Sequence, residues 1–559
     1  MIDWIKRVTA SHLSTAFIIT LMIPVVMLIY TEQNPFWCSA AMLLTPLGCY
    51  TIFASLARRS GLMVWIGFPI IFLSAFQIVL LYLFGNSVIA TDMFLNLTTT
   101  NPTEAGELLS NIYPAIIFVI ALYVPLLWFA AKHIRRRMTL PGKTRIKMVI
   151  IGMASLLLGC TALFLENSRK SSDIIRDELF PANAIYNMGL AISEDHNISH
   201  FQETSNGFKH HSERMENPTC REIYVLVIGE ASRAASWQLF GYERNTNPLL
   251  SLRDDLYLFR NVITQSNTTH KSVPMMLSSV HASQHKELYH RLGIAALFNE
   301  AGFTTYFISN QAPQGAMIDN LAHDAHNIEH MDAPNHDIQL VEAVRKALAE
   351  DRSEKILFIL HTYGSHFSYH QRYPREFAWF LPDDDVAIKY ENIEMIRNAY
   401  DNSIVYTDYI LNELIKTLEA QEEASAAMLY CADHGEDMFD GRKKRFLHAS
   451  PTATYHQLHV ASLAWVSPLY RKLFPEKADA AKLNEKVPAT TYSMFHTMAD
   501  IASISSPYVE TRASLMNRYF DFGAVRYYLN DHNQAVRLNR DIGIDEEELE
   551  FFKLHGIKP

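Results

Sequence analysis

The sequence predicts a multi-span α-helical membrane domain with five transmembrane helices, followed by an α/β domain. Five long apolar runs fall in the first third of the 559-residue chain. After residue 222, short apolar runs rich in β-forming residues alternate with helical patterns. A polar segment separates the two regions. We therefore expect a membrane domain at 1–166, a linker at 167–218 and a second domain at 219–559.

The five apolar runs cover residues 12–30, 36–56, 61–84, 112–131 and 146–165. Each has about 20 residues, enough for a helix to cross the roughly 30 Å hydrocarbon layer of a membrane. A buried helix of a soluble protein can imitate one such run, but five in succession favour membrane spans. A cleaved signal peptide is disfavoured for the first run, because no small-residue cleavage site follows it and four further runs come after it.

The basic residues of the connections predict the orientation of the spans. Lysine and arginine occur at 6–7, 58–59 and 132–147, whereas the connections at 31–35 and 85–111 contain neither. All three basic segments lie on one side of the membrane, which the positive-inside rule makes the cytoplasmic side. With five spans, the rest of the chain is expected to be exported.

The linker at 167–218 is polar, mixed in charge and rich in His, Asn and Ser, which is typical of a connection with one or two short interfacial helices. In the second domain, helices are expected at 338–349 and about 391–420. Strands are expected at 222–229, 304–309, 355–360, 426–432 and 460–467. This alternation indicates a mainly parallel sheet covered by helices on both faces. Ligands of such sheets bind at the carboxyl ends of the strands.

Polar side chains follow several of these strands, and they include carboxylates and imidazoles. The candidates are Glu230, His361, His366, Asp433, His434, His448 and His459. Nitrogen and oxygen ligands of this kind suit Zn²⁺, and a catalytic zinc site leaves one position for a reacting group. A hydroxyl in that position loses its proton more readily, so a threonine of the "NTT" stretch (267–269) can act as a nucleophile.

Each of these features also has an alternative interpretation without catalysis. An Asp-His pair occurs often by chance, and Glu230 can be a carboxylate that interacts with a helix dipole. The "NTT" stretch also matches a glycosylation sequon. Only the combination of a strand, an Asp-His pair and a following Gly-Glu favours a metal site.

Several motifs, in order along nearly the whole chain, resemble the phosphoethanolamine transferases of Gram-negative bacteria. They are "VIGEASR", "FGYERNTNPLL", a threonine five residues before the proline of "SVP", "HTYGSHFSYHQRYP", "YDNSIVYTDYI" and "ADHGED". The resemblance implies an alkaline-phosphatase/sulfatase-like catalytic domain in the periplasm. It also implies a multi-pass anchor in the bacterial cell inner membrane.

The resemblance also implies roles for particular residues. The nucleophile would be Thr269, and the zinc ligands would be Glu230, Thr269, Asp433 and His434. His448 and His366 match histidines near the transferred phosphate or a second zinc, and His361 and His459 are weaker candidates for substrate binding. Asn310 resembles a contact to the donor phosphate, and Asn96, Thr100 and Glu104 match residues associated with the lipid donor.

The sequence departs from the family pattern at three positions. Gln314 stands where a lysine often accompanies Asn310, which puts one phosphate contact in doubt. Gln265 and Met275 stand where many members place two cysteines that form a disulfide beside the nucleophile. We therefore expect the loop to be held by a turn at Ser272-Val273-Pro274 and by packing.

The predicted function is zinc-dependent transfer of phosphoethanolamine from phosphatidylethanolamine to an envelope glycan, most simply lipid A or lipopolysaccharide core, through Thr269. We expect a monomer that binds the membrane and no nucleic acid. A glycerol phosphate transferase of the lipoteichoic-acid-synthase type and a non-catalytic membrane-anchored binding protein are the alternatives. Sulfatase activity is disfavoured, because its modified-residue motif needs an arginine that "SVPMM" lacks.

Overall fold

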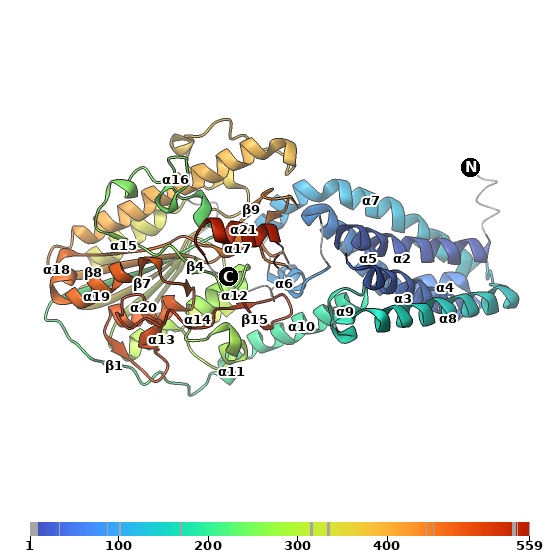
Figure 1. Ribbon diagram of the computed structural model, residues 1–559, viewed down its shortest axis with the longest axis horizontal. Coiled ribbons are helices and arrows are strands. Elements are labelled where there is room, and N and C mark those ends of the chain that lie inside the picture. Colours follow the sequence, from blue (N-terminus) through green and yellow to red (C-terminus); the bar gives the residue numbers. More distant parts are fainter. Residues whose placement is uncertain are drawn as a thin grey trace. The chain divides into compact units, whose positions relative to one another are not determined.

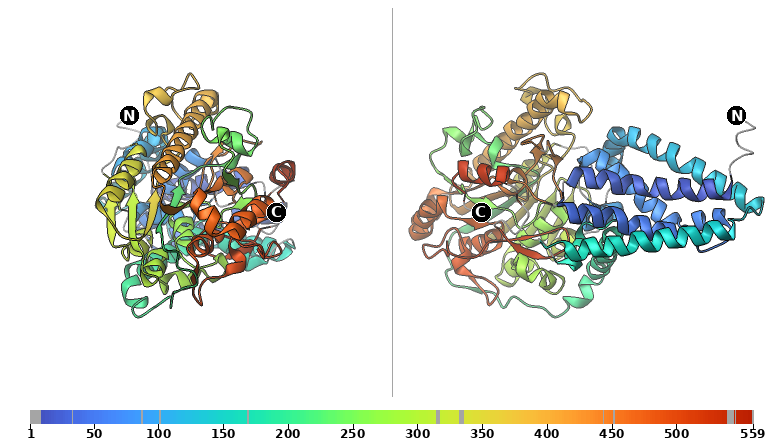
Figure 2. Two further views of the ribbon diagram at one scale, coloured as in Figure 1. Left: turned by 90° about the vertical axis from the view of Figure 1, so that its left-hand side faces the viewer. Right: turned by 45° about the vertical axis from the view of Figure 1, so that its right-hand side comes forward.

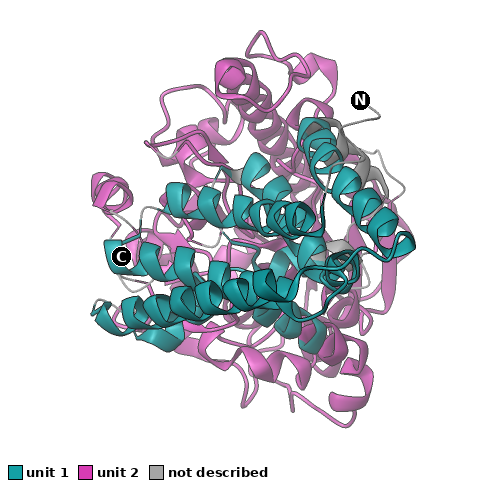
Figure 3. Ribbon diagram, turned by 90° about the vertical axis from the view of Figure 1, so that its right-hand side faces the viewer, with its two compact units in different colours: residues 1–98, 102–193 teal, residues 99–101, 194–559 magenta. Residues whose placement is uncertain are grey.

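The computed structural model describes residues 9–32, 34–85, 88–99, 102–167, 170–313, 317–331, 336–442, 444–450, 452–538, 544 and 546–557. The chain forms two compact units, which Figure 3 colours separately. Unit 1 comprises residues 1–98 and 102–193, and unit 2 comprises residues 99–101 and 194–559.

Unit 1 is built from helices, and among the residues that the structure describes four helices are long and apolar enough to cross a membrane. These are α2 (Ala10–Glu32), α3 (Phe36–Ser55), the Ile112–Arg135 part of α7 (Pro102–Arg135) and α8 (Gly142–Leu165). α4 (Ser60–Ile66) and α5 (Phe68–Phe84) are separated by a short break at which the chain bends by 60°. Counted together, these two helices form a fifth span. The predicted span at 61–84 is therefore a broken one.

Small residues allow close packing between α3 and α8. A side chain at Gly48 would come within 2.8 Å of the carbonyl oxygen of Gly152, so the two helix backbones approach directly. The Ser155 hydroxyl adds a 2.8 Å hydrogen bond to the carbonyl of Leu44. Such small-residue contacts are typical of helix association in a membrane.

Three helices lie in the expected linker region. They are α9 (Ser171–Asp177), α10 (Ala182–Ser199) and α11 (Phe201–Thr204). Together with α6 (Thr91–Thr99), they complete the helices that precede the sheet.

Unit 2 contains a seven-stranded sheet with the order β3-β11-β8-β2-β7-β5-β6. The strands are β2 (Arg221–Gly229), β3 (Leu256–Leu258), β5 (Thr304–Ser309), β6 (Asn327–His330), β7 (Lys355–His361), β8 (Ala424–Ala432) and β11 (Ser462–Val466). β8, β2, β7, β5 and β6 are mutually parallel, whereas β11 runs antiparallel to both β8 and β3. The predicted, mainly parallel sheet is confirmed.

Helices cover both faces of this sheet. Figure 1 shows α15 (Ile338–Glu350) and α16 (Ile393–Glu419) on one face, and the turned views of Figure 2 show the same layering. The other face carries α13 (Ile294–Glu300) and α20 (Ser493–Ile501), whose apolar side chains share one buried core with β2. This burial of apolar surface on both sides stabilises the sheet and fixes its carboxyl edge.

The remaining elements are short. α12 (Thr269–Met276), α14 (Met317–Ala322), α17 (Tyr455–Leu458), α18 (Pro468–Leu473), α19 (Pro475–Leu483) and α21 (Glu546–Leu554) complete the helices. Four two-stranded sheets pair β1 (Glu213–Arg214) with β13 (Ile504–Ser505), β4 (Val262–Ile263) with β12 (Ala489–Thr490), β9 (Asp437–Met438) with β10 (Phe446–Leu447), and β14 (Tyr527–Leu529) with β15 (Ala535–Arg537). All five cysteines are free.

Candidate active site

The register of the sheet brings the predicted strand-end residues to one place. Gly229 at the end of β2 pairs with Ala432 at the end of β8, so Glu230 and Asp433 leave the sheet side by side. On the other side of β2, Ile228 pairs with His361, the last residue of β7. Three chain segments separated by more than 70 residues therefore deliver carboxylate and imidazole groups to one edge.

Thr269 reaches this edge as the first residue of α12. Thr268 precedes the helix with φ −136° and ψ 136°, so the chain changes from extended to helical between the two threonines. The predicted turn at Ser272-Val273-Pro274 is wrong, because all three residues lie inside the helix. The Ser272 hydroxyl donates to the carbonyl of Asp433 at 2.6 Å and ties the helix to the end of β8.

The Thr269 hydroxyl lies among the predicted ligands. Its Oγ1 is 3.2 Å from Oε1 of Glu230 and 3.1 Å from Nε2 of His434. The same His434 nitrogen lies 3.4 Å from Glu230 and 3.3 Å from Oδ2 of Asp433. The structure thus brings all four predicted zinc ligands together.

The electrostatics of this cluster favour a bound cation. Glu230 and Asp433 are both fully buried. Burial and the neighbouring Asp433 raise the pKa of Glu230 well above its usual value, and burial raises the pKa of Asp433 to about 7. Burial lowers the pKa of His434 well below its usual value, so it is a neutral imidazole with a nitrogen lone pair to donate. Buried like charges of this kind need a partner of opposite charge.

The residues fit a zinc ion. One ligand atom each from Glu230, Asp433 and His434 lie within 4.8 Å of one another. Oδ2 of Asp433 is buried without a hydrogen-bond partner, as expected of an oxygen that would coordinate a metal ion. Two carboxylates, an imidazole and a hydroxyl also match the oxygen and nitrogen ligands of zinc.

The other carboxylate oxygen of Asp433 has a structural role. Oδ1 of Asp433 accepts hydrogen bonds from the backbone N–H of Ala231 and of His434. On the opposite side of the cluster, Nδ1 of His434 hydrogen-bonds with the Gly435 carbonyl at 2.9 Å. Such outer contacts orient metal ligands before the metal binds.

Gly364 allows another segment to approach Glu230 closely. A side chain at this residue would come within 2.8 Å of the carbonyl oxygen of Glu230, and its φ of +52° lies in the left-handed region. The next residue, Ser365, donates its backbone N–H to that carbonyl at 3.0 Å. The loop after β7 is thereby fixed against the backbone of Glu230.

His448 lies beside the cluster and is oriented by a carboxylate. Its Nδ1 is 3.1 Å from Oε2 of Glu436, and the phenol of Tyr369 donates to the other oxygen of Glu436 at 3.1 Å. The rings of His448 and His434 are 4.1 Å apart between centroids. Burial opposes charge on His448, but Glu436 outweighs it and raises the pKa of His448.

His366 differs from His448 in its surroundings. Its ring stacks on Tyr363, with centroids 5.4 Å apart, and its buried Nδ1 has no hydrogen-bond partner. Burial, followed by the charges of Arg372 and His448, lowers the pKa of His366 well below its usual value. His366 is therefore held neutral in this structure.

Gln311 also lies in the site, although no sequence motif predicted it. Its side-chain nitrogen donates to Oε2 of Glu230 at 3.1 Å and to the carbonyl of Thr362 at 2.9 Å, and it lies 3.2 Å from Nε2 of His361. Gln311 therefore fixes the Glu230 carboxylate and links it to His361. The only sequence signal was its position next to Asn310 at the end of a strand.

Asn310 and His459 have other partners. The Asn310 amide donates to Asp337 at 2.7 Å, and Asp337 also accepts the N–H groups of Tyr363 and Gly364. The ring nitrogens of His459 hydrogen-bond with Tyr455 and with the carbonyl of Arg260, and not with the carboxylate and histidine cluster.

Four predicted positions lie outside the described residues. These are the side chains of Asn96 and Glu104, and the residues Thr100 and Gln314.

Gln265 and Met275, at the positions where the family pattern places cysteines, hold the segment around Thr269 in another way. The backbone N–H of Gln265 donates to Thr491, and its side-chain oxygen accepts the N–H of Ala282 at 2.8 Å. Met275 is fully buried in a small core with Ala282 and Leu529. The N–H of Leu529 in turn donates to the carbonyl of Gln265 at 2.7 Å. Hydrogen bonds and packing thus anchor both flanks of Thr269.

The sulfatase family model matches residues 222–504, half of the chain, so unit 2 belongs to the sulfatase family of folds. A second family model, phosphoethanolamine transferase EptA/EptB, matches residues 47–195. The chain belongs to the phosphoethanolamine transferase family, and it is an enzyme of that family with a membrane domain and a soluble C-terminal domain.

Curated relatives cover most of the chain. It is 26% identical over 456 residues to Phosphoethanolamine transferase EptA of Escherichia coli K12, covering 77% of this chain and 81% of the relative. It is also 26% identical over 462 residues to the Kdo(2)-lipid A phosphoethanolamine 7''-transferase of the same organism, covering 76% and 80%.

Solved structures share the fold. The lipooligosaccharide phosphoethanolamine transferase A of Neisseria meningitidis, an integral membrane protein, matches with a TM-score of 0.71 and 20% identity over 91% of this chain and 98% of that chain. The periplasmic domain of EptC from Escherichia coli in complex with Zn matches with a TM-score of 0.53 and 23% identity, covering 59% and 95%.

Proposed function

We propose that this enzyme transfers phosphoethanolamine from phosphatidylethanolamine to lipid A or lipopolysaccharide core, with Thr269 as the residue that carries the group. The observation that supports this best is the position of the Thr269 hydroxyl, within 3.2 Å of Glu230 and 3.1 Å of His434. A hydroxyl in contact with a carboxylate and a neutral imidazole is placed for activation as a nucleophile.

The proposed cofactor is zinc, bound by Glu230, Asp433 and His434 together with Thr269. Bound there, zinc would lower the pKa of the Thr269 hydroxyl and offset negative charge on the phosphoryl oxygens. The EptC domain from Escherichia coli has been solved with Zn, and the ligand set of this chain fits the same ion.

In the first step, the Thr269 hydroxyl gives its proton to the Glu230 carboxylate, Oγ1 attacks the phosphorus of the donor, and the bond from phosphorus to the diacylglycerol oxygen breaks. Thr269 is the first residue of α12, so its oxygen lies at the positive end of the helix. The free N–H groups of a helix N-terminus favour negative charge on a bound phosphate.

The departing diacylglycerol oxygen needs a proton, and a histidine is suited to supply it. His448 is the better oriented candidate, because Glu436 accepts from Nδ1 and leaves Nε2 for the substrate. His366, the other candidate, is less suited to donate a proton, because burial lowers its pKa and holds it neutral. In the second step, an oxygen of the acceptor attacks the same phosphorus and any proton that it carries passes to the histidine. The bond to Thr269 breaks, and the Thr269 oxygen regains its proton from Glu230.

The membrane domain suits a lipid donor, whose acyl chains stay in the bilayer while the head group reaches Thr269. The distribution of lysine and arginine favours a location in the inner membrane with the catalytic unit in the periplasm. Relatives named as lipid A modifying enzymes support the choice of acceptor.

The experiment uses the full-length enzyme in detergent with phosphatidylethanolamine or phosphatidylglycerol labelled in the head group. We expect label on the peptide that contains Thr269 with the first lipid only. Mass spectrometry of lipopolysaccharide from strains with and without the gene then identifies the acceptor. Label from phosphatidylglycerol alone would replace our proposal with glycerol phosphate transfer.

A further inference from the structure

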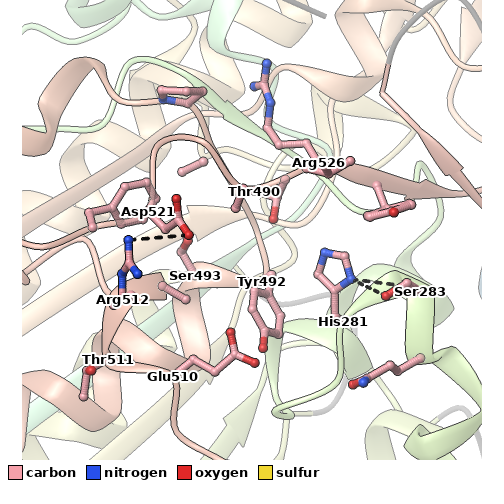
Figure 4. Close-up of a pocket in the computed structure, with 18 of the residues that line it drawn as sticks. His281, Ser283, Thr490, Tyr492, Ser493, Glu510, Thr511, Arg512, Asp521 and Arg526 are labelled. Atoms are coloured by element: carbon pink, nitrogen blue, oxygen red, sulfur yellow. Dashed lines mark hydrogen bonds and ion pairs between the residues drawn. The ribbon is translucent and has the colours of Figure 1, made fainter.

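A groove of about 600 Å³ lies in unit 2, lined by the segments 281–284, 488–493, 509–513 and 520–527. Figure 4 shows the polar side chains that surround it. None of its lining residues belongs to the proposed zinc cluster. We call this hollow the C-terminal groove. Its volume is in the range of small-molecule sites.

The charges that line the C-terminal groove are balanced. Glu510 and Asp521 carry negative charge, and Arg512 and Arg526 carry positive charge. Arg512 lies 3.7 Å from Asp521, and Arg526 donates to Asn261 at 3.1 Å. Burial lowers the pKa of His281, so its imidazole is neutral at pH 7. A polyanion would therefore face two carboxylates, and a cation would face two guanidinium groups.

The remaining lining groups suit a ligand with many hydroxyls. Hydroxyls of Ser283, Thr490 and Ser493 can donate or accept, the carboxylates only accept and the guanidinium groups only donate. Aromatic rings provide apolar surface between these groups. The His281 ring packs edge to face against Tyr492 at 4.9 Å and against Tyr527 at 5.3 Å between centroids.

The walls of the groove are joined to the nucleophile segment through one residue. Gln265, four residues before Thr269, hydrogen-bonds with Ala282 in the segment 281–284, with Thr491 in the segment 488–493, and with Leu529 just after the segment 520–527. A shift of the segments 281–284, 488–493 or 520–527 would thus be transmitted to the segment that carries Thr269. This links occupancy of the groove to the proposed transfer site.

We infer that the C-terminal groove binds a neutral sugar unit of the glycan that accepts phosphoethanolamine. A sugar ring offers hydroxyl donors and acceptors around its edge and apolar C–H surface on its faces, which matches the balanced charge, the hydroxyls and the aromatic rings. The inference rests on the proposed function for the identity of the acceptor. The binding of a sugar can be measured without any transfer.

The test uses the full-length enzyme in detergent and N-acetyl-D-glucosamine as the probe, with saturation-transfer NMR as the readout. We expect saturable binding that is weakened about tenfold in Glu510→Gln and in Asp521→Asn, since hydrogen bonds to charged groups are the stronger ones. Glu476→Gln is the matched control, because Glu476 is an exposed carboxylate on α19 outside the groove. Thermal melting checks that all variants are folded.

Three outcomes would overturn the inference. They are no saturable signal with the wild type, unchanged binding in both groove variants, and displacement of the sugar by inorganic phosphate, which would make the groove an anion site. With acceptor present, the groove variants should raise the acceptor KM.

The same measurements separate this inference from the proposed function. Thr269→Ala should bind the sugar as the wild type does while it forms no labelled intermediate. Sugar binding without labelling of wild-type Thr269 would remove the proposed function. Labelling of Thr269 with no groove-dependent sugar binding would remove only the groove assignment.

Discussion

The hydroxyl oxygen of Thr269 lies 3.1 Å from Nε2 of His434, although the two residues are 165 positions apart in the chain. The contact joins the first residue of a helix to the end of a strand. It depends on the Ser272 hydrogen bond to the carbonyl of Asp433, which holds helix and strand together. Thr269 and its neighbour Thr268 therefore differ, because only the Thr269 hydroxyl contacts His434.

Thr269→Ala should abolish labelling by the donor and reduce transfer by roughly three orders of magnitude, as expected for loss of a nucleophile. Thr268→Ala should retain transfer, because the Thr268 hydroxyl makes only a 3.4 Å contact with Ser266 and does not cap α12. Intact-protein mass spectrometry after incubation with phosphatidylethanolamine measures the adduct. An adduct on Thr269→Ala would show that another residue carries the group.

Asp433→Asn should lower the zinc content of the purified protein, because it removes the charge of a buried oxygen that has no hydrogen-bond partner. In chelator-stripped protein at pH 8 the same change should raise the Tm, since it relieves repulsion with Glu230. Elemental analysis and thermal melting measure the two effects. Asp479→Asn, at an exposed carboxylate, is the control and should change neither. Unaltered zinc content in Asp433→Asn would contradict the ligand assignment.

His448→Gln should slow labelling of Thr269 by roughly 10²- to 10⁴-fold, the usual contribution of a general acid. His459→Gln should lower thermal stability and leave the labelling rate near that of the wild type, because His459 bonds Tyr455 and Arg260. Timed assays of diacylglycerol release measure the labelling rate of both variants, and thermal melting measures their stability. Equal rate losses in the two variants would argue against a special role for His448.

Met275→Ala should lower the free energy of unfolding by about 3 kcal/mol, the usual cost of removing a large buried side chain. Met275 is fully buried against Ala282 and Leu529. Met215→Ala is the control, because Met215 is 69% exposed and should change stability by less than about 0.5 kcal/mol. Denaturant titration gives both values, and a small loss in Met275→Ala would mean that packing does not hold this segment.

Stability should fall in mildly acidic solution because of His210. Burial outweighs the nearby Glu300 carboxylate and lowers the pKa of His210 from 6.5 to about 4. Below pH 6.5 the unfolded chain binds a proton that the folded protein excludes, so the free energy of unfolding decreases until about pH 4. The full effect is about 3 kcal/mol.

The comparison of the wild type with His210→Gln isolates this contribution, since all other titrating groups are common to both. Tm values between pH 5 and 8 should converge for the two proteins as the pH falls. A constant difference across this range would show that His210 does not titrate as described.

The sheet was predictable because its central strands are continuous apolar runs. The run at 304–309 coincides with β5, and the predicted helix at 338–349 differs from α15 by one residue. β3 and β6 were not predicted. The apolar run of β3 has only three residues and is too short to stand out, and β6 is a mostly exposed edge strand without an apolar run. The Ser272-Val273-Pro274 turn was wrongly predicted, since proline usually ends a helix but is tolerated here inside α12.

The site was predictable where a polar residue directly follows a strand, as for Glu230 and Asp433. The contribution of Gln311 could not be predicted in this way, because its contact with Glu230 depends on the register between β5, β7 and β2. Long-range register is set by packing of the whole sheet and is not written in any local stretch.

The catalytic unit folds without forming a disulfide. The segment around Thr269 is held by Gln265 and Met275, and all five cysteines are unpaired. Folding of the catalytic unit therefore requires no oxidant and no thiol-disulfide isomerase. Dithiothreitol should therefore leave its melting temperature and its transfer rate unchanged.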